Sequence, residues 1–272
     1  MPELPEVETT RAGLEPLLKG RTLLGATVRI PGLRWPIPRD LGALLGGQKI
    51  QAVERRAKYL LIRCQGGTLL LHLGMSGHLQ VVPTALAAGR HDHVDLHLDN
   101  GNCLRFHDPR RFGALLWSED DPLQHPLLAA LGPEPLDPAL QGDYLYRVSR
   151  GKNVVVKVFL MDQKVLVGVG NIYASEALFR ARINPLTPAG TLGLQRYQRL
   201  LAAVREVLNE AIAAGGTTLR DFRNEGGKPG YFARELQVYG KDGQPCRVCG
   251  SSIRQCRQGQ RSTYYCPNCQ RR

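Results

Sequence analysis

The chain has 272 residues, of which 43% are hydrophobic and 22% are charged. This is ordinary globular usage, so it excludes a wholly disordered chain and a collagen-like repeat, and the length predicts about two domains. No apolar run approaches the roughly 20 residues of a transmembrane helix, and the opening MPELPEVETTRAGLE lacks the apolar centre of a signal peptide. We therefore expect a cytoplasmic protein.

The charge balance indicates a polyanionic partner. The chain has 36 Lys and Arg against 24 Asp and Glu, a net charge of +12. Residues 233–272 hold eight basic and two acidic residues, so half of the excess lies in the last 40 residues. Such an excess favours nucleic acid. A basic ribosomal protein or a membrane-surface protein would have the same balance.

The first half of the chain predicts one helix followed by strands. Residues 6–18 follow Pro5 and place apolar side chains at helical spacing. Asn100-Gly101 between two strand-like runs is a hairpin signal. Eight short strands at this spacing predict an antiparallel sandwich or barrel. The predicted strands are 22–30, 49–56, 59–63, 68–73, 79–82, 94–98, 103–106 and 114–117.

The second half is helical in its periodicity. GPEPLDP at 132–138 has three prolines and predicts a semi-rigid linker. Helices are predicted over 154–166, 171–181 and 194–214, the last of them ended by Gly215-Gly216. Residues 217–231 are polar and glycine-rich, a loop of the length usually reserved for function.

Five of the seven cysteines crowd into residues 246–269. Two CxxC pairs, Cys246/Cys249 and Cys266/Cys269, are separated by sixteen residues. This spacing predicts a closed, structural four-thiolate zinc site. Cys256 is spare, and Cys64 and Cys103 read as small buried hydrophobes. Between the pairs a hairpin is expected to carry Arg261 near its tip, where it either reaches a phosphate or is simply solvated.

A glycine-rich turn, VGVGN at 167–171, precedes the second of these helices. Asn171 is interpreted as the N-cap of a helix end that attracts anions, with a nucleic-acid phosphate as the candidate. A tight interhelical turn that binds nothing explains the same residues.

The amino terminus offers an unusual amine. Removal of Met1 would expose Pro2, a secondary amine with a pKa of roughly 8. Attack of this nitrogen on C1′ of a deoxyribose would give an iminium ion, and Glu3 would serve as general acid. Alternatively, Pro2 and Pro5 only set the start of a helix whose dipole the glutamates favour.

Nine motifs, spread from end to end, together resemble bacterial formamidopyrimidine-DNA glycosylases. They are PELPEVE (2–8), RRAKYL (55–60), HLGMSG (72–77), HDHVD (91–95), DPRRFG (108–113), VGVGNIYASEALF (167–179), GGTTLRDF (215–222), GKPGYF (227–232) and the four-cysteine ribbon. The resemblance implies an α+β multidomain protein with an N-terminal antiparallel β-sandwich (1–131), a linker (132–151), a helix–two-turn–helix domain (152–237) and a zinc finger (238–272).

The same resemblance implies roles for particular residues. Pro2 matches the Schiff-base nucleophile and Glu3 the proton donor, while Glu6 supports the same site. Lys58 matches a lysine associated with β-elimination. Arg261 matches the zinc-finger arginine that grips the lesion phosphates and assists δ-elimination.

Further positions match residues that contact DNA. Met75, Arg110 and Phe112 match residues inserted into the duplex where the damaged base leaves. Residues 217–231 match the loop that folds over the extruded base. GKN at 151–153 is less basic than the corresponding run of some relatives. The remaining expected contacts are His72, His91, Lys152, Lys157 and Asn171.

The function implied is that of a bifunctional base-excision-repair DNA glycosylase and AP lyase. It would remove 8-oxoguanine and formamidopyrimidines from double-stranded DNA through a Pro2 Schiff base, then cleave the strand by β,δ-elimination. We expect one structural Zn²⁺ and no catalytic metal or organic cofactor. The expected partner is duplex DNA with oxidised purines or abasic sites, bound by a monomer associated with the bacterial nucleoid, away from membranes.

Two other functions compete with this one. An endonuclease VIII type of enzyme would remove oxidised pyrimidines, although PELPE rather than PEGPE at the start and the full 217–231 loop favour the purine enzyme. A non-catalytic zinc-ribbon protein would bind DNA without cutting it.

Overall fold

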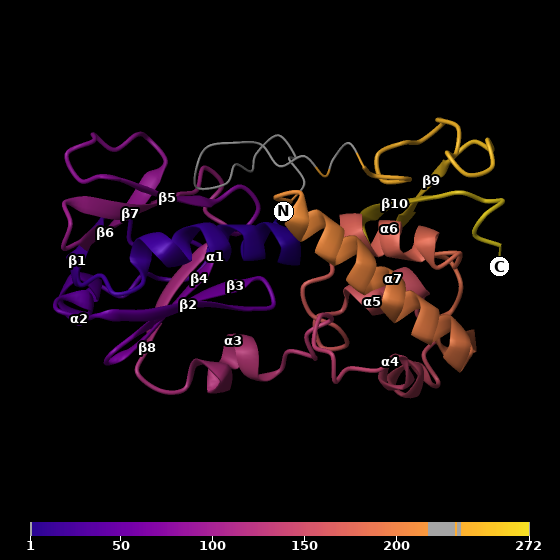
Figure 1. The fold of residues 1–272 in the computed structure, drawn as a ribbon, viewed down its shortest axis with the longest axis horizontal. Helices are drawn as coiled ribbons and strands as arrows, with labels where there is room; N and C mark the ends of the chain where they lie inside the picture. Colours follow the sequence, from indigo (N-terminus) through magenta and orange to yellow (C-terminus); the bar gives the residue numbers. More distant parts are fainter. Residues whose placement is uncertain (1, 217–231, 233–234, 272) are drawn as a thin grey trace. The chain divides into compact units, whose positions relative to one another are not determined.

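The computed structural model describes residues 2–216, 232 and 235–271, which divide into two compact units (Figure 1). Unit 1 comprises residues 2–129, 214–216 and 232, and unit 2 comprises residues 130–213 and 235–271. Within these residues, every helix is too short or too polar to cross a bilayer.

Unit 1 is an antiparallel β-sandwich, as predicted. Helix α1 (Leu4–Leu18) is followed by two four-stranded sheets with the strand orders β1-β6-β7-β5 and β2-β3-β4-β8. The strands are β1 (Leu23–Val28), β2 (Ile50–Arg56), β3 (Tyr59–Cys64), β4 (Gly67–His72), β5 (His78–Pro83), β6 (Asp92–Leu98), β7 (Asn102–His107) and β8 (Ala114–Ser118). The sequence did not predict α2 (Leu41–Leu45), η1 (Pro122–Gln124) or α3 (Pro126–Ala129), which are too short to show a helical period.

One hydrophobic core joins both sheets to α1. Leu14 and Leu18 of α1 pack with Leu71 of β4 and Leu104 of β7, and all four are at most 1% exposed. The predicted hairpin at Asn100-Gly101 is confirmed, because Gly101 has a φ of 80° and the Asn100 side chain accepts a hydrogen bond from the Asn102 amide. The turn between β6 and β7 is therefore fixed by its own residues.

Unit 2 combines helices with a small hairpin. Its elements are α4 (Gly142–Ser149), α5 (Val156–Met161), α6 (Asn171–Arg180), η2 (Ala189–Thr191), α7 (Leu194–Ala213), β9 (Arg254–Gln258) and β10 (Arg261–Tyr265). The helix predicted over 154–166 is too long. It ends at Met161, because the Asp162 side chain accepts a hydrogen bond from the Lys164 amide and turns the chain. Helix α4 was not predicted.

The proline-rich stretch at 132–138 is attached to unit 2. The Gly132 amide donates to the Gln163 carbonyl over 2.8 Å. The Arg205 guanidinium on α7 donates to the carbonyls of Pro135, Asp137 and Leu140 at 2.8, 2.6 and 2.6 Å. This segment is therefore held by backbone hydrogen bonds and by the Arg205 side chain, and the four-part division of the chain stays a prediction.

Candidate functional site

The first turn of α1 gathers buried carboxylates directly after a proline. Pro2 is buried, and Glu3 and Glu6 are each 2% exposed. Glu3 is the N-cap, and its amide donates to Glu6 Oε2 over 2.9 Å, which forms part of a capping box. Glu6 therefore fixes the backbone of Glu3, and through it the position of Pro2.

Two further residues of unit 1 approach this helix start. A Cβ built on Gly216 would lie 3.2 Å from Glu6 Cγ, so the backbone of Gly216 packs against that side chain. Phe232, which is 1% exposed, donates from its amide to the Gly216 carbonyl over 3.1 Å. The predicted base-covering loop at 217–231 lies outside the described residues.

Lys58 stands in a two-residue turn between β2 and β3 and is 8% exposed. The preceding Ala57 has a φ of 54°, a conformation that favours glycine. Arg55 holds the turn, because it donates to the Ala57 carbonyl over 3.0 Å and pairs with Glu8 of α1 over 2.9 Å. One ion pair thus ties helix α1 to the turn that carries Lys58.

His72 ends β4 in the same region of the sandwich. Burial, followed by the positive charges of Lys58 and Arg34, lowers the pKa of His72 to about 4. The ring is therefore neutral at pH 7, and its Nδ1 accepts a hydrogen bond from the Gly74 amide over 2.9 Å. The ring also lies 4.8 Å from that of Tyr59.

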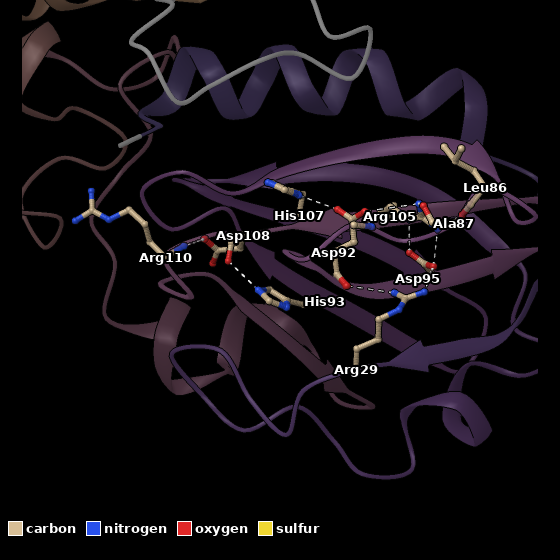
Figure 2. A network of polar contacts seen from close by, with 11 residues as sticks. Arg29, Leu86, Ala87, Asp92, His93, Asp95, Arg105, His107, Asp108 and Arg110 are labelled. Carbon is tan, nitrogen blue, oxygen red and sulfur yellow. Dashed lines mark hydrogen bonds and ion pairs between the residues drawn. The ribbon is translucent and has the colours of Figure 1, made fainter.

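Arg110 and Phe112 lie on one loop, between β7 and β8, and both are exposed. The Arg110 guanidinium carbon lies 5.3 Å from the centroid of the Phe112 ring. Asp108, which is fully buried, shapes this loop by accepting hydrogen bonds from the amides of Gly113 at 2.8 Å and Arg110 at 3.3 Å. His93 in turn donates to the Asp108 carbonyl over 2.9 Å (Figure 2).

Glycines bring the Met75 loop against the Phe112 loop. Gly74 has a φ of 67°, and a Cβ on it would lie 2.5 Å from the backbone of Phe112 and of Gly113. Contacts of this length exclude any side chain. Met75, which is partly buried, and the exposed Phe112 are therefore held on adjacent turns.

His91 directly precedes Asp92, the first residue of β6, and carboxylates fix the side chains around it. The Asp92 side chain is hydrogen-bonded to His107 at 2.7 Å and accepts from the Gly89 amide at 2.7 Å. On the same two strands, Arg105 of β7 binds Asp95 of β6 through two hydrogen bonds of 2.8 and 2.9 Å (Figure 2). Burial alone would raise the pKa of Asp95, but hydrogen bonds from Arg105 and Arg29 hold it below its ordinary value.

In unit 2, Asn171 stands at the start of α6, but it is not the N-cap. Gly170 has the extended N-cap conformation, and Asn171 is the first helical residue. The sequence predicted Asn171 as the N-cap, and the cap is instead the residue before it. Glycine can occupy an N-cap although it has no side chain to accept a hydrogen bond. The Asn171 side chain instead accepts from Lys157 Nζ over 2.6 Å and donates to the Tyr239 hydroxyl over 3.3 Å.

Lys157 is buried, at 1% exposure, although the resemblance implied a DNA contact. Besides Asn171, its ammonium donates to the Ser262 carbonyl at 2.9 Å and to Thr263 Oγ1 at 2.8 Å. One buried cation thus joins α5, the start of α6 and strand β10.

Arg261 and Lys152 are both exposed. Arg261 follows a two-residue turn in which Gly259 and Gln260 have φ values of 49° and 63°. Positive φ at both positions suits a tight hairpin. Arg261 therefore projects from the tip of the β9–β10 hairpin. Lys152 follows Gly151, which has a φ of 71°.

The four predicted cysteine ligands converge at the other end of this hairpin. Their sulfur atoms all lie within 4.8 Å of one another. The Sγ atoms of Cys246 and Cys269 are 3.9 Å apart, and those of Cys249 and Cys266 are 3.4 Å apart. Tetrahedral Zn–S bonds of about 2.3 Å require separations of roughly 3.8 Å, so the four thiolates fit a structural zinc ion. Cys64, Cys103 and Cys256 lie outside this cluster.

Gln270 joins the zinc site to the helices. Its side chain accepts from the Cys266 amide at 2.8 Å and donates to the Ile183 carbonyl at 2.9 Å, just beyond α6. The Asn184 side chain donates to the Gln270 carbonyl over 2.8 Å. The metal site therefore also fixes the loop that follows α6.

Family models match three successive stretches of the chain. Residues 1–115 match the formamidopyrimidine-DNA glycosylase N-terminal domain, residues 131–223 its H2TH domain, and residues 243–272 the zinc finger found in FPG and IleRS. The formamidopyrimidine-DNA glycosylase of Alkalilimnicola ehrlichii is 62% identical, with all of both chains covered. The chain belongs to the formamidopyrimidine-DNA glycosylase family. It is accordingly a DNA glycosylase of base excision repair, in a family characterised by lyase activity.

Other relatives agree. The formamidopyrimidine-DNA glycosylase of Stutzerimonas stutzeri is 59% identical over the whole of both chains. The crystal structure of MutM (Fpg) from Thermus thermophilus has a TM-score of 0.88 and 42% identity, covering 99% of this chain and 98% of that one. A complex of the Lactococcus lactis Fpg with abasic-site DNA has a TM-score of 0.92 and 31% identity, covering 99% and 100%.

Several residues that organise the site escaped prediction as site residues. Asp108 is part of the quoted DPRRFG motif, but its burial depends on the fold. Arg55 and Glu8 also lie in quoted motifs, and nothing in the sequence pairs them. The αL conformation of Ala57 has no sequence signal at all, because alanine rarely adopts it.

Proposed function

We propose that this chain removes oxidised purines from duplex DNA and cuts the strand, with the nitrogen of Pro2 as nucleophile. The observation that carries the proposal is the position of Pro2, buried and directly before the buried Glu3–Glu6 pair at the start of α1. In this family of DNA glycosylases, such an arrangement suits an amine that attacks a sugar carbon.

The first step replaces the base with the Pro2 nitrogen at C1′ and then opens the sugar ring. Once Met1 is removed, the Pro2 nitrogen attacks C1′ of the damaged nucleoside, the bond from C1′ to the base breaks, and the proton lost by the nitrogen neutralises the leaving base; breakage of the C1′–O4′ bond then gives the iminium. Glu3 delivers a proton as the sugar ring opens. Glu6 acts by positioning, because its carboxylate is already committed to the Glu3 amide.

Strand cleavage follows from the iminium. A proton leaves C2′ and the C3′–O bond breaks, which is β-elimination; loss of the 5′ phosphate is δ-elimination. We assign Lys58 to proton transfer in the first of these steps. Its neighbour His72 is neutral at pH 7. The ring can therefore accept hydrogen bonds and orient the groups around it, but it does not act as a cation.

The DNA contacts belong to two groups. In unit 1, Met75, Arg110 and Phe112 fill the space left by the extruded base, and His91 contacts the backbone. Held on adjacent turns, these side chains form a preorganised wedge. In unit 2, Asn171 and Arg261 bind phosphates and the exposed Lys152 adds charge, while Lys157 holds Asn171 in place.

The proposed substrate is a duplex with an oxidised purine or an abasic site, bound by a monomer in the bacterial nucleoid. Fpg of Lactococcus lactis has been crystallised with Fapy-dG DNA, with abasic-site DNA and with DNA containing an oxidised pyrimidine. The third complex makes an oxidised-pyrimidine duplex a necessary comparison in any assay.

The test is a nicking assay with borohydride trapping. We expect scission at 8-oxoguanine opposite cytosine, faster than at an oxidised thymine, and a covalent protein–DNA adduct after reduction. Binding without scission would favour a non-catalytic DNA-binding protein. Scission confined to the oxidised thymine would favour an endonuclease VIII type of activity.

A further inference from the structure

The loop between β1 and α2 carries an exposed arginine and an exposed tryptophan side by side, Arg34 and Trp35. The loop is tightly folded at this point. The Leu33 amide donates to the Trp35 carbonyl over 3.0 Å, and the Ile37 amide donates to the Pro31 carbonyl over 3.1 Å. Ile37 is 4% exposed and belongs to the core of the sandwich. The backbone that carries Arg34 and Trp35 is therefore fixed on unit 1.

This loop is bonded to the Phe112 loop, which carries part of the proposed wedge. The Arg34 amide donates to the Gly113 carbonyl over 3.0 Å. Gly113 in turn lies beside the end of β4, because a Cβ built on it would lie 2.9 Å from the carbonyl oxygen of His72. Arg34 therefore lies at the same end of the sandwich as His72 and the Phe112 loop.

The charge of Arg34 acts on side chains of the proposed reaction site. Burial is the largest cause that lowers the pKa of His72, and the charges of Lys58 and Arg34 lower it further. Burial raises the pKa of Tyr59, and the charge of Arg34 opposes this rise. The rings of Tyr59 and His72 are 4.8 Å apart. Arg34 and Lys58 therefore add positive charge to one region of unit 1.

No acidic group neutralises Arg34. Across the described ranges 2–216, 232 and 235–271, no carboxylate forms an ion pair with its guanidinium. By contrast, Arg29 at the start of the same loop pairs with Asp95. The Arg34 guanidinium carbon lies 6.0 Å from the centroid of the Trp35 ring. An aromatic face attracts a guanidinium without neutralising it, so the charge stays available to an anion.

We propose that Arg34 binds one of the two phosphates that flank the lesion nucleoside, while Trp35 restrains its guanidinium. Lys58 is assigned to proton transfer at the sugar of that nucleoside, and the flanking phosphates are the anions joined to this sugar through its 3′ and 5′ oxygens. A guanidinium binds a phosphate through paired, charge-assisted hydrogen bonds. The inference rests on the proposed place of Lys58 beside the lesion, but it does not depend on the Pro2 nucleophile.

The test measures binding of the zinc-loaded full chain to a duplex with a tetrahydrofuran in place of the lesion nucleoside. This site has no base to remove and forms no imine, so failure of the Pro2 proposal would leave the affinities unchanged. Fluorescence polarisation over a salt series reports the Kd and the number of phosphates neutralised. We expect Arg34→Gln to raise the Kd about tenfold and to lower the salt slope by about one phosphate contact. Trp35→Leu should raise the Kd about threefold, because it removes the cation–π contact.

Arg39→Gln is the matched control. Arg39 is an exposed arginine of the same loop, and its charge is not among those that shift the pKa of His72 or Tyr59. We expect this variant to change the Kd by less than about twofold, because salt screens a charge that does not touch a phosphate. Arg34→Gln keeps the backbone amide that bonds Gly113, so it should melt at the parent temperature. Arg34→Lys keeps the charge and should recover part of the affinity.

Replacing one phosphate at a time by an uncharged methylphosphonate locates the contact. At one phosphate that flanks the tetrahydrofuran, the parent and Arg34→Gln should bind equally, because the contact is already lost there. The proposal is overturned if Arg34→Gln binds the unmodified duplex as tightly as the parent, or if Arg39→Gln weakens binding equally. It is also overturned if the two proteins bind equally at neither flanking phosphate, or only when a phosphate of the undamaged strand is replaced.

Discussion

The two units hold their proposed DNA-contacting side chains by different means. In unit 1, the organising contacts are close in sequence: Glu6 binds the amide of Glu3, and Asp108 binds the amides of Arg110 and Gly113. In unit 2, the buried Lys157 reaches Thr263, 106 residues away, and Gln270 reaches Ile183, 87 residues away. The Glu3 and Arg110 backbones of unit 1 are therefore fixed within single segments, whereas the Asn171 side chain of unit 2 is fixed by a lysine that also bonds the zinc-finger hairpin.

The buried groups at Asp108 and Lys157 also carry opposite charges. Unit 1 uses a buried carboxylate, Asp108. Its oxygen atoms accept hydrogen bonds from backbone amides and so fix the loop that carries Arg110. Unit 2 uses the buried ammonium of Lys157. It donates hydrogen bonds to neutral oxygens of Asn171, Ser262 and Thr263. In both units a buried charged group bonds a residue that we propose contacts DNA, Arg110 in unit 1 and Asn171 in unit 2.

Loss of zinc should have the largest effect on DNA affinity, and only through the unit 2 contacts. Cys249→Ser or a chelator should release the hairpin that carries Arg261, because a finger of this size folds on its metal. We expect affinity for an abasic duplex to fall at least about tenfold, or about 1.4 kcal/mol. Cys256→Ser is the matched control and should keep both zinc and affinity. Undiminished binding by the metal-free protein would show that unit 2 does not depend on its finger.

Replacing the buried cation should come next. Lys157→Met leaves three oxygen acceptors without their donor, which we expect to lower the free energy of unfolding by about 2–3 kcal/mol in urea titrations. Lys152→Met, at an exposed position, should change stability by less than about 0.5 kcal/mol and reduce the salt dependence of DNA binding by about one phosphate contact. Equal stability of the two variants would remove the proposed positioning role of Lys157.

The corresponding change in unit 1, at Asp108, should lower the free energy of unfolding somewhat less. Asp108→Asn keeps the shape of the side chain but loses its charge and one hydrogen-bond acceptor. We therefore expect the free energy of unfolding to fall by about 2 kcal/mol. We also expect slower extrusion of the damaged base. Asp99→Asn, at a half-exposed pair with Arg21 at 3.9 Å, should cost less than about 1 kcal/mol. Thermal melting and a fluorescent base analogue opposite the lesion would report the two effects.

The smallest expected effect is a pH dependence in unit 1. Because the folded pKa of His72 is about 4, against about 6.5 unfolded, the folded state binds fewer protons between these values. Stability should therefore fall as pH drops below 6.5, by about 1 kcal/mol between pH 7 and pH 5.5. The His72→Gln variant should lose less stability than the parent between pH 7 and pH 5.5. An identical loss in the variant would assign the acid sensitivity to other groups.

Much of this architecture was readable from the sequence. Strand alternation predicted all eight strands of the sandwich, and the cysteine spacing predicted the four sulfur atoms that converge. Short helices and the α5 boundary were missed, because single turns and the Asp162 side chain escape a periodicity test.

The candidate site was less predictable in detail. The motifs predicted roles for Pro2, Lys58 and Arg261, which stay predictions. The burial of Lys157 results from contacts over more than 100 residues, which no local pattern contains. The shift of the cap from Asn171 to Gly170 depends on backbone angles.

Locating the trapped sugar on the polypeptide tests the central assignment most directly. After borohydride reduction of the complex with 8-oxoguanine DNA, nuclease and protease digestion and mass spectrometry would identify the modified peptide. The account predicts a reduced sugar on the peptide that begins at Pro2, and no adduct on chains that retain Met1. A sugar on Lys58 or another lysine, or equal trapping of Met1-bearing protein, would contradict it.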